Sequence, residues 1–185
     1  MNISEIREVL IASFKDMVKM ATAKIAEWEG GSEYHNPETD TWTAYDDKIG
    51  GNVPTVGPGI TGQIDGEPIE IGREYPSDEV SGELGSRLKD EWDWISSKMK
   101  GTWGDLNANQ KTAVISLLHN VGASNFHDTK AYKHLQSGNL EGFAHEAFDP
   151  NIGFVRAGGE IIEGLQNRRA HERDLFFTDM SESAF

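Results

Sequence analysis

The sequence predicts an α+β fold that is mostly α-helical, with a small β lobe and a larger helical lobe joined by a long helix. Apolar residues recur three and four positions apart at the start of the chain and over most of its second half, which is helical spacing. Short alternating runs with turn residues fill only residues 42 to 75. At 185 residues and 37% apolar content, the chain is expected to form a single domain with a sizeable core.

The first predicted helix begins near Ile3, with Ser4 as its cap, and ends at Gly30-Gly31. Its first part, residues 1 to 20, is expected to be an extra N-terminal helix. We expect its apolar stripe to pack on the helical lobe, because an uncovered stripe of that length would favour aggregation.

The remaining elements follow from local signals. Asp65-Gly66 indicates a hairpin turn, and Asn107 is a cap for a helix over residues 109 to 121 that is apolar nearly all round. The predicted helices of the second half cover residues 77 to 99, 109 to 121, 129 to 137, 139 to 147 and 160 to 177. The first of these joins the β lobe to the helical lobe.

Two carboxylates and a hydroxyl form a candidate catalytic set, Glu29, Asp47 and Thr55. The negative end of the helix dipole would raise the pKa of Glu29, and so would partial desolvation by Trp28 and Trp42 if they lie nearby, as expected. A proton donor at neutral pH requires such a raised pKa. Polar, turn-rich surroundings should leave Asp47 ionised, and the Thr55 hydroxyl can hold a water. This is equipment for hydrolysing a glycosidic bond. The spacing alone also allows another interpretation, in which Glu29 is one of many surface acids and Asp47 is a turn residue.

The charge is strongly negative, with 31 Asp and Glu against 17 Lys and Arg, so nucleic acid is not an expected partner. Four arginines late in the chain offer two alternatives: a local basic cleft, or the balancing of acidic neighbours along an exposed helix. They are Arg156, Arg168, Arg169 and Arg173. Zero cysteines exclude disulfides and thiol catalysis. No apolar run is long enough for a membrane span, and the first residues lack a basic start followed by an apolar stretch, so a secretion signal is not expected.

Several motifs, in matching order over residues 22 to 178, resemble the phage-type lysozymes, the endolysins of glycoside hydrolase family 24. The motifs are Glu29-Gly30, Ala44-Tyr45-Asp46-Asp47, Thr55-Val56-Gly57-Pro58-Gly59, Leu106-Asn107-Ala108-Asn109-Gln110, Leu118-His119-Asn120-Val121-Gly122 and the segment 158 to 172. The chain departs from the family in a longer interval between Glu29 and Asp47, in a small insertion before Thr55, and in Ile60, which replaces a usual His. We expect activity to survive that last change.

The resemblance implies a lysozyme-like fold and a muramidase that cuts the β-1,4 bond between N-acetylmuramic acid and N-acetylglucosamine with inversion. It implies Glu29 as the acid, Asp47 and Thr55 as the holders of the water, and sugar contacts by Asn120, Gly164 and Leu165. No cofactor or metal is expected. The expected partner is peptidoglycan, with a monomeric enzyme that starts in the host cytoplasm and reaches the wall through a permeabilised membrane. The alternatives are a lytic transglycosylase and a catalytically silent wall-binding or virion component.

Overall fold

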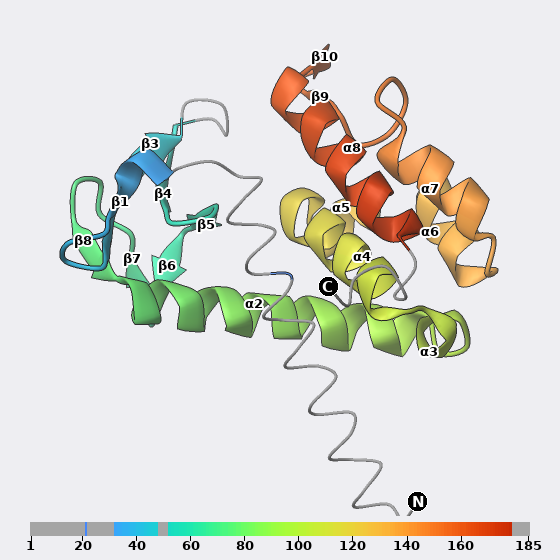
Figure 1. The fold of residues 1–185 in the computed structure, drawn as a ribbon, viewed down its shortest axis with the longest axis horizontal. Coiled ribbons are helices and arrows are strands. Elements are labelled where there is room, and N and C mark those ends of the chain that lie inside the picture. The colour runs from blue at the N-terminus through green and yellow to red at the C-terminus, as the bar shows by residue number, and fades with distance from the viewer. Residues whose placement is uncertain (1–20, 22–31, 48–51, 179–185) are drawn as a thin grey trace, which may run out of the picture. The chain divides into compact units, whose positions relative to one another are not determined.

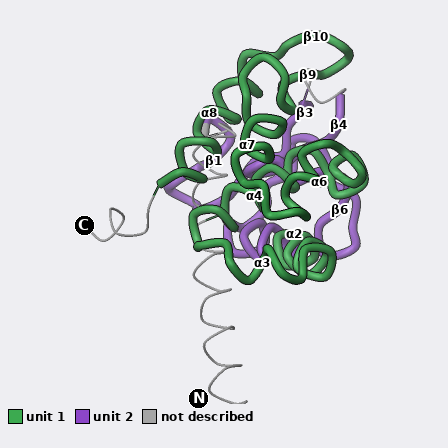
Figure 2. The backbone as a smooth tube through the Cα atoms, turned by 90° about the vertical axis from the view of Figure 1, so that its right-hand side faces the viewer, with its two compact units in different colours: residues 1–21, 88–185 green, residues 22–87 purple. Residues whose placement is uncertain are grey.

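The computed structural model describes residues 21, 32–47 and 52–178 (Figure 1). The chain divides into two compact units, one formed by residues 22–87 and the other by residues 1–21 with 88–185 (Figure 2). Helix α2, Ser77–Lys98, runs across this division, as the sequence predicts for the joining helix. The mixed fold, mostly α with small sheets, is confirmed. The predicted first helix, the expected docking of residues 1 to 20 and the position of Glu29 all lie outside the described residues.

The unit of residues 22–87 contains the β strands of the predicted β lobe. Its elements are η1 (Ser32–Tyr34), β1 (His35–Asn36), β2 (Thr41–Thr43), β3 (Tyr45–Asp47), β4 (Val53–Val56), β5 (Ile60–Thr61), β6 (Gln63–Ile64), β7 (Glu67–Pro68) and β8 (Glu74–Pro76). The strands pair antiparallel in the orders β1-β2-β8, β3-β4-β5 and β6-β7. The hairpin turn at Asp65-Gly66 is confirmed, and both residues have positive φ. The predicted start of the β structure, residue 42, lies too far along the chain, because His35 already pairs with Trp42.

The core of this unit forms between the short strands and the first half of α2. Val56, Ile60 and Ile64 are buried from the strands, while Val80 and Leu84 are buried from α2. Ile60 is therefore a core residue, at the position where the phage-type lysozymes usually have a His.

Gly57 is fixed by both its backbone conformation and its surroundings. It has a φ of +57°, and a Cβ added there would lie 2.5 Å from Cγ1 of Val80. We expect Gly57→Ala to lower the free energy of unfolding by about 2–4 kcal/mol, since it adds backbone strain to overpacking. Gly62→Ala is the matched control: φ is +85° there, but no atom lies within 4 Å of the added Cβ. Urea unfolding should give the smaller loss for Gly62→Ala, and equal losses would contradict the steric argument.

The described helices of the other unit follow α2 along the chain. They are α3 (Thr102–Asp105), α4 (Ala108–Val121), α5 (Ala123–Phe126), α6 (Lys130–Gln136), α7 (Leu140–Phe148) and α8 (Glu163–Phe177), with a small hairpin of β9 (Arg156–Ala157) and β10 (Glu160–Ile161) before α8. The cap at Asn107 is confirmed: its side chain accepts from the N–H of Gln110, whose side chain accepts from the N–H of Asn107.

The last helix begins at Glu163, three residues later than predicted. Gly158 and Gly159 both have positive φ, which allows the tight turn of the β9–β10 hairpin. Glu160 and Ile161 are therefore strand residues rather than the first turn of the helix.

Helices α4 and α8 pack together in antiparallel directions. Asn109, near the start of α4, donates to the carbonyl of Thr178 just after α8, at 3.0 Å. Two turns further along α4, the hydroxyl of Ser116 donates to Glu172, at 2.6 Å. The middle of α4 is buried all round, as expected for a helix that is apolar nearly all round, and α4 is therefore the central helix of this unit.

Candidate active site

Asp47 and Thr55 lie on the same face of a two-stranded ladder. Tyr45 on β3 pairs directly with Thr55 on β4, and Asp47 pairs with Val53. Because alternate residues of a strand point to the same face, the side chains of Tyr45, Asp47, Val53 and Thr55 share one face. Asp47 and Thr55 are diagonal neighbours there, a relation that typically separates residues by roughly 7–8 Å. One water can bridge two side chains at that spacing.

The hydrogen bond of Thr55 decides how such a water would be oriented. Its hydroxyl donates to the carbonyl oxygen of Val53 at 2.9 Å, and the residue is 1% exposed. Since a hydroxyl has one hydrogen and two lone pairs, Thr55 Oγ1 is left as an acceptor. An ionised carboxylate at Asp47 also only accepts. A water between them would donate one hydrogen to each and keep its oxygen lone pairs for attack.

Tyr45 occupies the same face beside this pair. Its ring stacks on the ring of Tyr34, with 4.1 Å between centroids and 9° between planes. Burial raises the pKa of Tyr45 above its ordinary value, and the negative charge of Asp47 adds to the rise. The hydroxyl of Tyr45 therefore lies within the electrostatic reach of Asp47. Neither tyrosine was among the predicted site residues, although Tyr45 stands inside the motif Ala44-Tyr45-Asp46-Asp47.

The structure thus brings together two of the three predicted catalytic residues, Asp47 and Thr55. The third, Glu29, lies outside the described residues. Its role as the acid remains a prediction.

The predicted sugar-binding residues lie at one end of the α4–α8 pair. Gly164 and Leu165 are in the first turn of α8. Asn120 is one turn beyond Ser116 on α4, and the antiparallel packing places that turn beside the start of α8. Asn120 and Leu165 are partly exposed and Gly164 is exposed, so all three can meet a ligand.

Two of the late arginines pair with an acidic neighbour on the same helix, as one alternative expected, but they are buried, which is contrary to both alternatives. Arg168 is 4% exposed, and Arg169 and Glu172 are fully buried. Glu172 Oε1 accepts from Arg168 Nε at 3.1 Å and from Arg169 Nη2 at 2.9 Å, and Glu172 Oε2 lies 2.6 Å from Arg169 Nε. Arg168 also donates to the carbonyl of Ser116 at 3.0 Å. This buried cluster therefore holds α8 on α4, and neither a basic cleft nor an exposed charged helix includes these residues.

His119 behaves as a core histidine, as a residue on the central helix should. Its side chain is 6% exposed, and Nδ1 lies 3.2 Å from Glu91 Oε1 on α2. This pair joins α4 to the second half of α2 within one unit.

His35, Asp40 and Ser77 lie together at the start of α2, but they do not form a catalytic triad. Nε2 of His35 lies 3.3 Å from Asp40 Oδ1 and also 3.3 Å from Ser77 Oγ. A nucleophilic triad needs the serine on one ring nitrogen and the acid on the other. Since one nitrogen serves both partners here, the contact is a structural link. The Ser77 hydroxyl, and then His35, lower the pKa of Asp40.

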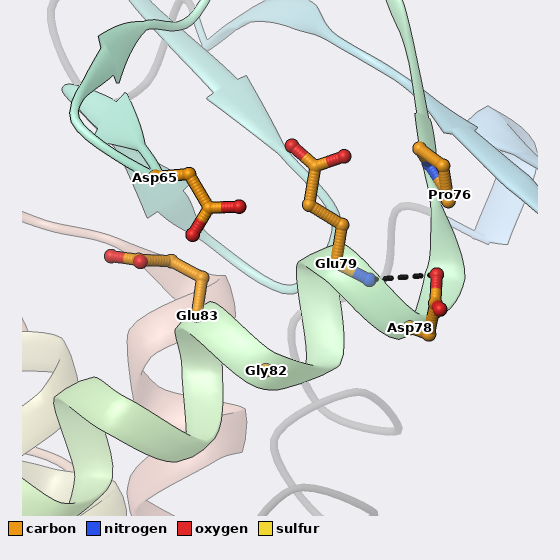
Figure 3. Close-up of a pocket in the computed structure, with 6 residues that line it drawn as sticks. All are labelled: Asp65, Pro76, Asp78, Glu79, Gly82 and Glu83. Atoms are coloured by element: carbon orange, nitrogen blue, oxygen red, sulfur yellow. Dashed lines mark hydrogen bonds between the residues drawn. The ribbon is translucent and has the colours of Figure 1, made fainter.

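A pocket of about 520 Å³ lies at the beginning of α2, beside the β6–β7 turn. Figure 3 shows its acidic lining, with Asp65 from the turn and Asp78, Glu79 and Glu83 from the first two turns of the helix. Asp78 accepts from the N–H of Glu79 at 3.0 Å. Across the described residues as a whole, no group of three or more His, Cys, Asp or Glu side chains is placed to hold a metal ion.

The sequence that forms these strands and helices matches a known family. The model of the family described as phage lysozyme matches residues 36–172. The chain belongs to the phage lysozyme family. The matched segment includes Asp47, Thr55 and the predicted sugar-binding residues, while Glu29 and Tyr34 precede it.

Curated relatives of this phage lysozyme include two proteins from different phages. The endolysin of Salmonella phage P22 is 32% identical over 142 residues, which cover 76% of this chain and 90% of that protein. The SAR-endolysin of Enterobacteria phage P21 is 30% identical over 135 residues, with 73% and 74% covered. The resemblance read from the motifs is therefore confirmed.

Solved structures support the same fold. A crystal structure of a mutant P22 lysozyme matches with a TM-score of 0.64 and 30% identity, covering 85% of this chain and 95% of that one. The endolysin from Escherichia coli O157:H7 phage FAHEc1 matches with a TM-score of 0.65, covering 85% and 90%, and at 23% identity it shows the fold alone. In the part of this phage lysozyme that the structure describes, no helix has both the length and the apolar character to cross a membrane.

Proposed function

We propose that this phage lysozyme is a muramidase that hydrolyses the β-1,4 bond between N-acetylmuramic acid and N-acetylglucosamine in bacterial peptidoglycan. The observation that carries the proposal is the shared face of Asp47 and Thr55 on the β3–β4 ladder, in a chain that belongs to this family. The two side chains there have the acceptor groups needed to hold one water. The endolysin names of the relatives from phages P22 and P21 agree with an enzyme that acts on the host cell wall.

The proposed reaction is a single displacement. Glu29 gives its proton to the glycosidic oxygen as the bond between that oxygen and the anomeric carbon breaks. The water held by Asp47 and Thr55 forms the new bond from the opposite face, and its proton passes to Asp47. The anomeric configuration inverts, which requires the carboxyl groups of Glu29 and Asp47 to lie about 6.5–9.5 Å apart.

Asn120, Gly164 and Leu165 are proposed to contact the saccharide. Their common position at one end of the α4–α8 pair supports this role. The enzyme is proposed to act as a monomer, to need no cofactor, and to reach the wall from the host cytoplasm once the membrane has been permeabilised.

The products of digestion test this function. Purified peptidoglycan would be digested in water enriched in ¹⁸O, and the released fragments analysed by mass spectrometry and by NMR of the anomeric protons. We expect new reducing ends of N-acetylmuramic acid that carry one ¹⁸O and appear first as the α anomer. Fragments with 1,6-anhydro ends would identify a lytic transglycosylase instead. Binding to the wall without fragment release would identify a silent wall-binding protein.

A further inference from the structure

Tyr34 contacts the strand that carries Asp47. It ends the short helix η1, in the lengthened interval between Glu29 and Asp47, and it precedes the segment that the family model matches. Its ring lies almost parallel to that of Tyr45, at 4.1 Å. The end of η1 thus places an aromatic ring against Tyr45 on the strand that carries Asp47.

Tyr45 connects this stack to the candidate water site. It stands directly opposite Thr55 and two residues before Asp47, on the face that all three share. The causes that raise its pKa are burial first, then the charge of Asp47, then Tyr34 and Glu33. Tyr45 therefore interacts with Asp47 through charge and with Tyr34 through the ring stack.

Strand β3 has a reason to need such support. It is an edge strand of only three residues, paired with β4 alone in its sheet. The backbone before it is fixed, since Ala44 accepts from the N–H of Gly72 at 2.8 Å and donates to the carbonyl of Arg73 at 2.9 Å. At the far end, the carbonyl of Asp47 accepts from the N–H of Asn52 at 2.9 Å. Between these two anchors, the stacked ring of Tyr34 restrains Tyr45 and with it the face of the strand that also carries Asp47.

We propose that Tyr34 is a positioning residue of the hydrolytic site: by stacking on Tyr45 it holds the Asp47 carboxylate in register with Thr55. The inference rests on the proposed muramidase function. Tyr34 acts through its ring and touches neither the sugar nor the water. Phenylalanine should therefore replace it, whereas an aliphatic residue should not.

The test compares Tyr34→Phe and Tyr34→Leu, with His35→Leu as a matched control. His35 stands next in sequence and also belongs to an aromatic pair, with Trp42 at 4.6 Å, but it contacts the start of α2 rather than β3. Release of reducing ends from soluble peptidoglycan strands would be measured well below the unfolding temperature. We expect Tyr34→Leu to lower kcat about threefold to tenfold with KM unchanged. Tyr34→Phe and His35→Leu should keep kcat within about twofold.

A second readout does not depend on activity. The ¹³C resonance of the Asp47 carboxyl group is expected to move in Tyr34→Leu and to stay in place in Tyr34→Phe and His35→Leu. A resonance that stays in place in Tyr34→Leu overturns the inference, as does a normal kcat for that variant. Equal losses in Tyr34→Phe, or in His35→Leu, overturn it too, since they indicate a hydroxyl contact or a general loosening of the unit. If the wild type releases no sugar ends, the proposed function fails, and the Asp47 resonance still decides whether Tyr34 positions that carboxylate.

Discussion

Replacing Asp47 by asparagine is expected to lower kcat by about 10²–10⁴-fold, the usual contribution of a general base. The amide keeps the size of the side chain and its place on the Thr55 face of the ladder. It cannot take a proton from the water, so the loss should fall on kcat while KM changes little. The measurement is the release of reducing ends from peptidoglycan under saturating substrate.

Asp46→Asn is the matched control for this variant. Asp46 is the preceding residue of β3 and points to the opposite face of the ladder, paired with Pro54. The same chemical change there should leave kcat within about threefold, because it lies away from the water site. A comparable loss in both variants would show that charge on the strand matters in general, and would remove the specific role of Asp47.

Replacing Glu172 by glutamine is expected to lower the free energy of unfolding by about 3–5 kcal/mol, as for other buried ion pairs that lose one partner. Glu172 is fully buried and is the shared carboxylate of Arg168 and Arg169. Burial lowers the pKa of Arg168 to about 10, and the charge of Glu172 opposes that shift. Without this charge, two guanidinium groups would remain in the interior with a neutral amide between them. Urea unfolding followed by circular dichroism measures the loss.

Asp174→Asn offers the control on the same helix, since Asp174 is exposed. Its effect on the free energy of unfolding should stay within about 0.5 kcal/mol, as for most surface changes. If Glu172→Gln were as stable as the wild type, the cluster would not be what holds α8 on α4.

The elements that sequence reasoning predicted well carry their signals locally. Asn107 and Gln110 form a capping box within four residues, and Asp65-Gly66 closes a hairpin whose strands adjoin it. Strand β1 was missed because two residues have no periodicity to detect. The start of α8 was misplaced because Glu160 and Ile161 look helical until the paired glycines before them turn the chain.

In the candidate site, too, the sequence shows the local motifs but not the contacts between distant residues. The motifs point to Asp47 and Thr55, but their common face depends on the register between β3 and β4, which only the structure supplies. The burial of Arg168 and Arg169 could not be predicted, because charged residues usually stay exposed and Ser116, which bonds to Arg168, is more than fifty positions away along the chain. The proposed role of Tyr34 could not be predicted from the sequence, because it depends on the stack of its ring on Tyr45.

The acidic pocket at the start of α2 has a consequence for encounter with the substrate. Four acidic residues line it, on a chain whose formal charge is already −14. Cell walls that carry anionic polymers repel such a surface, and mobile cations shorten the range of that repulsion to about 10 Å at 0.1 M salt. The rate at which the protein encounters the cell wall would then depend on the ionic strength of the surroundings rather than on the chemistry of bond cleavage.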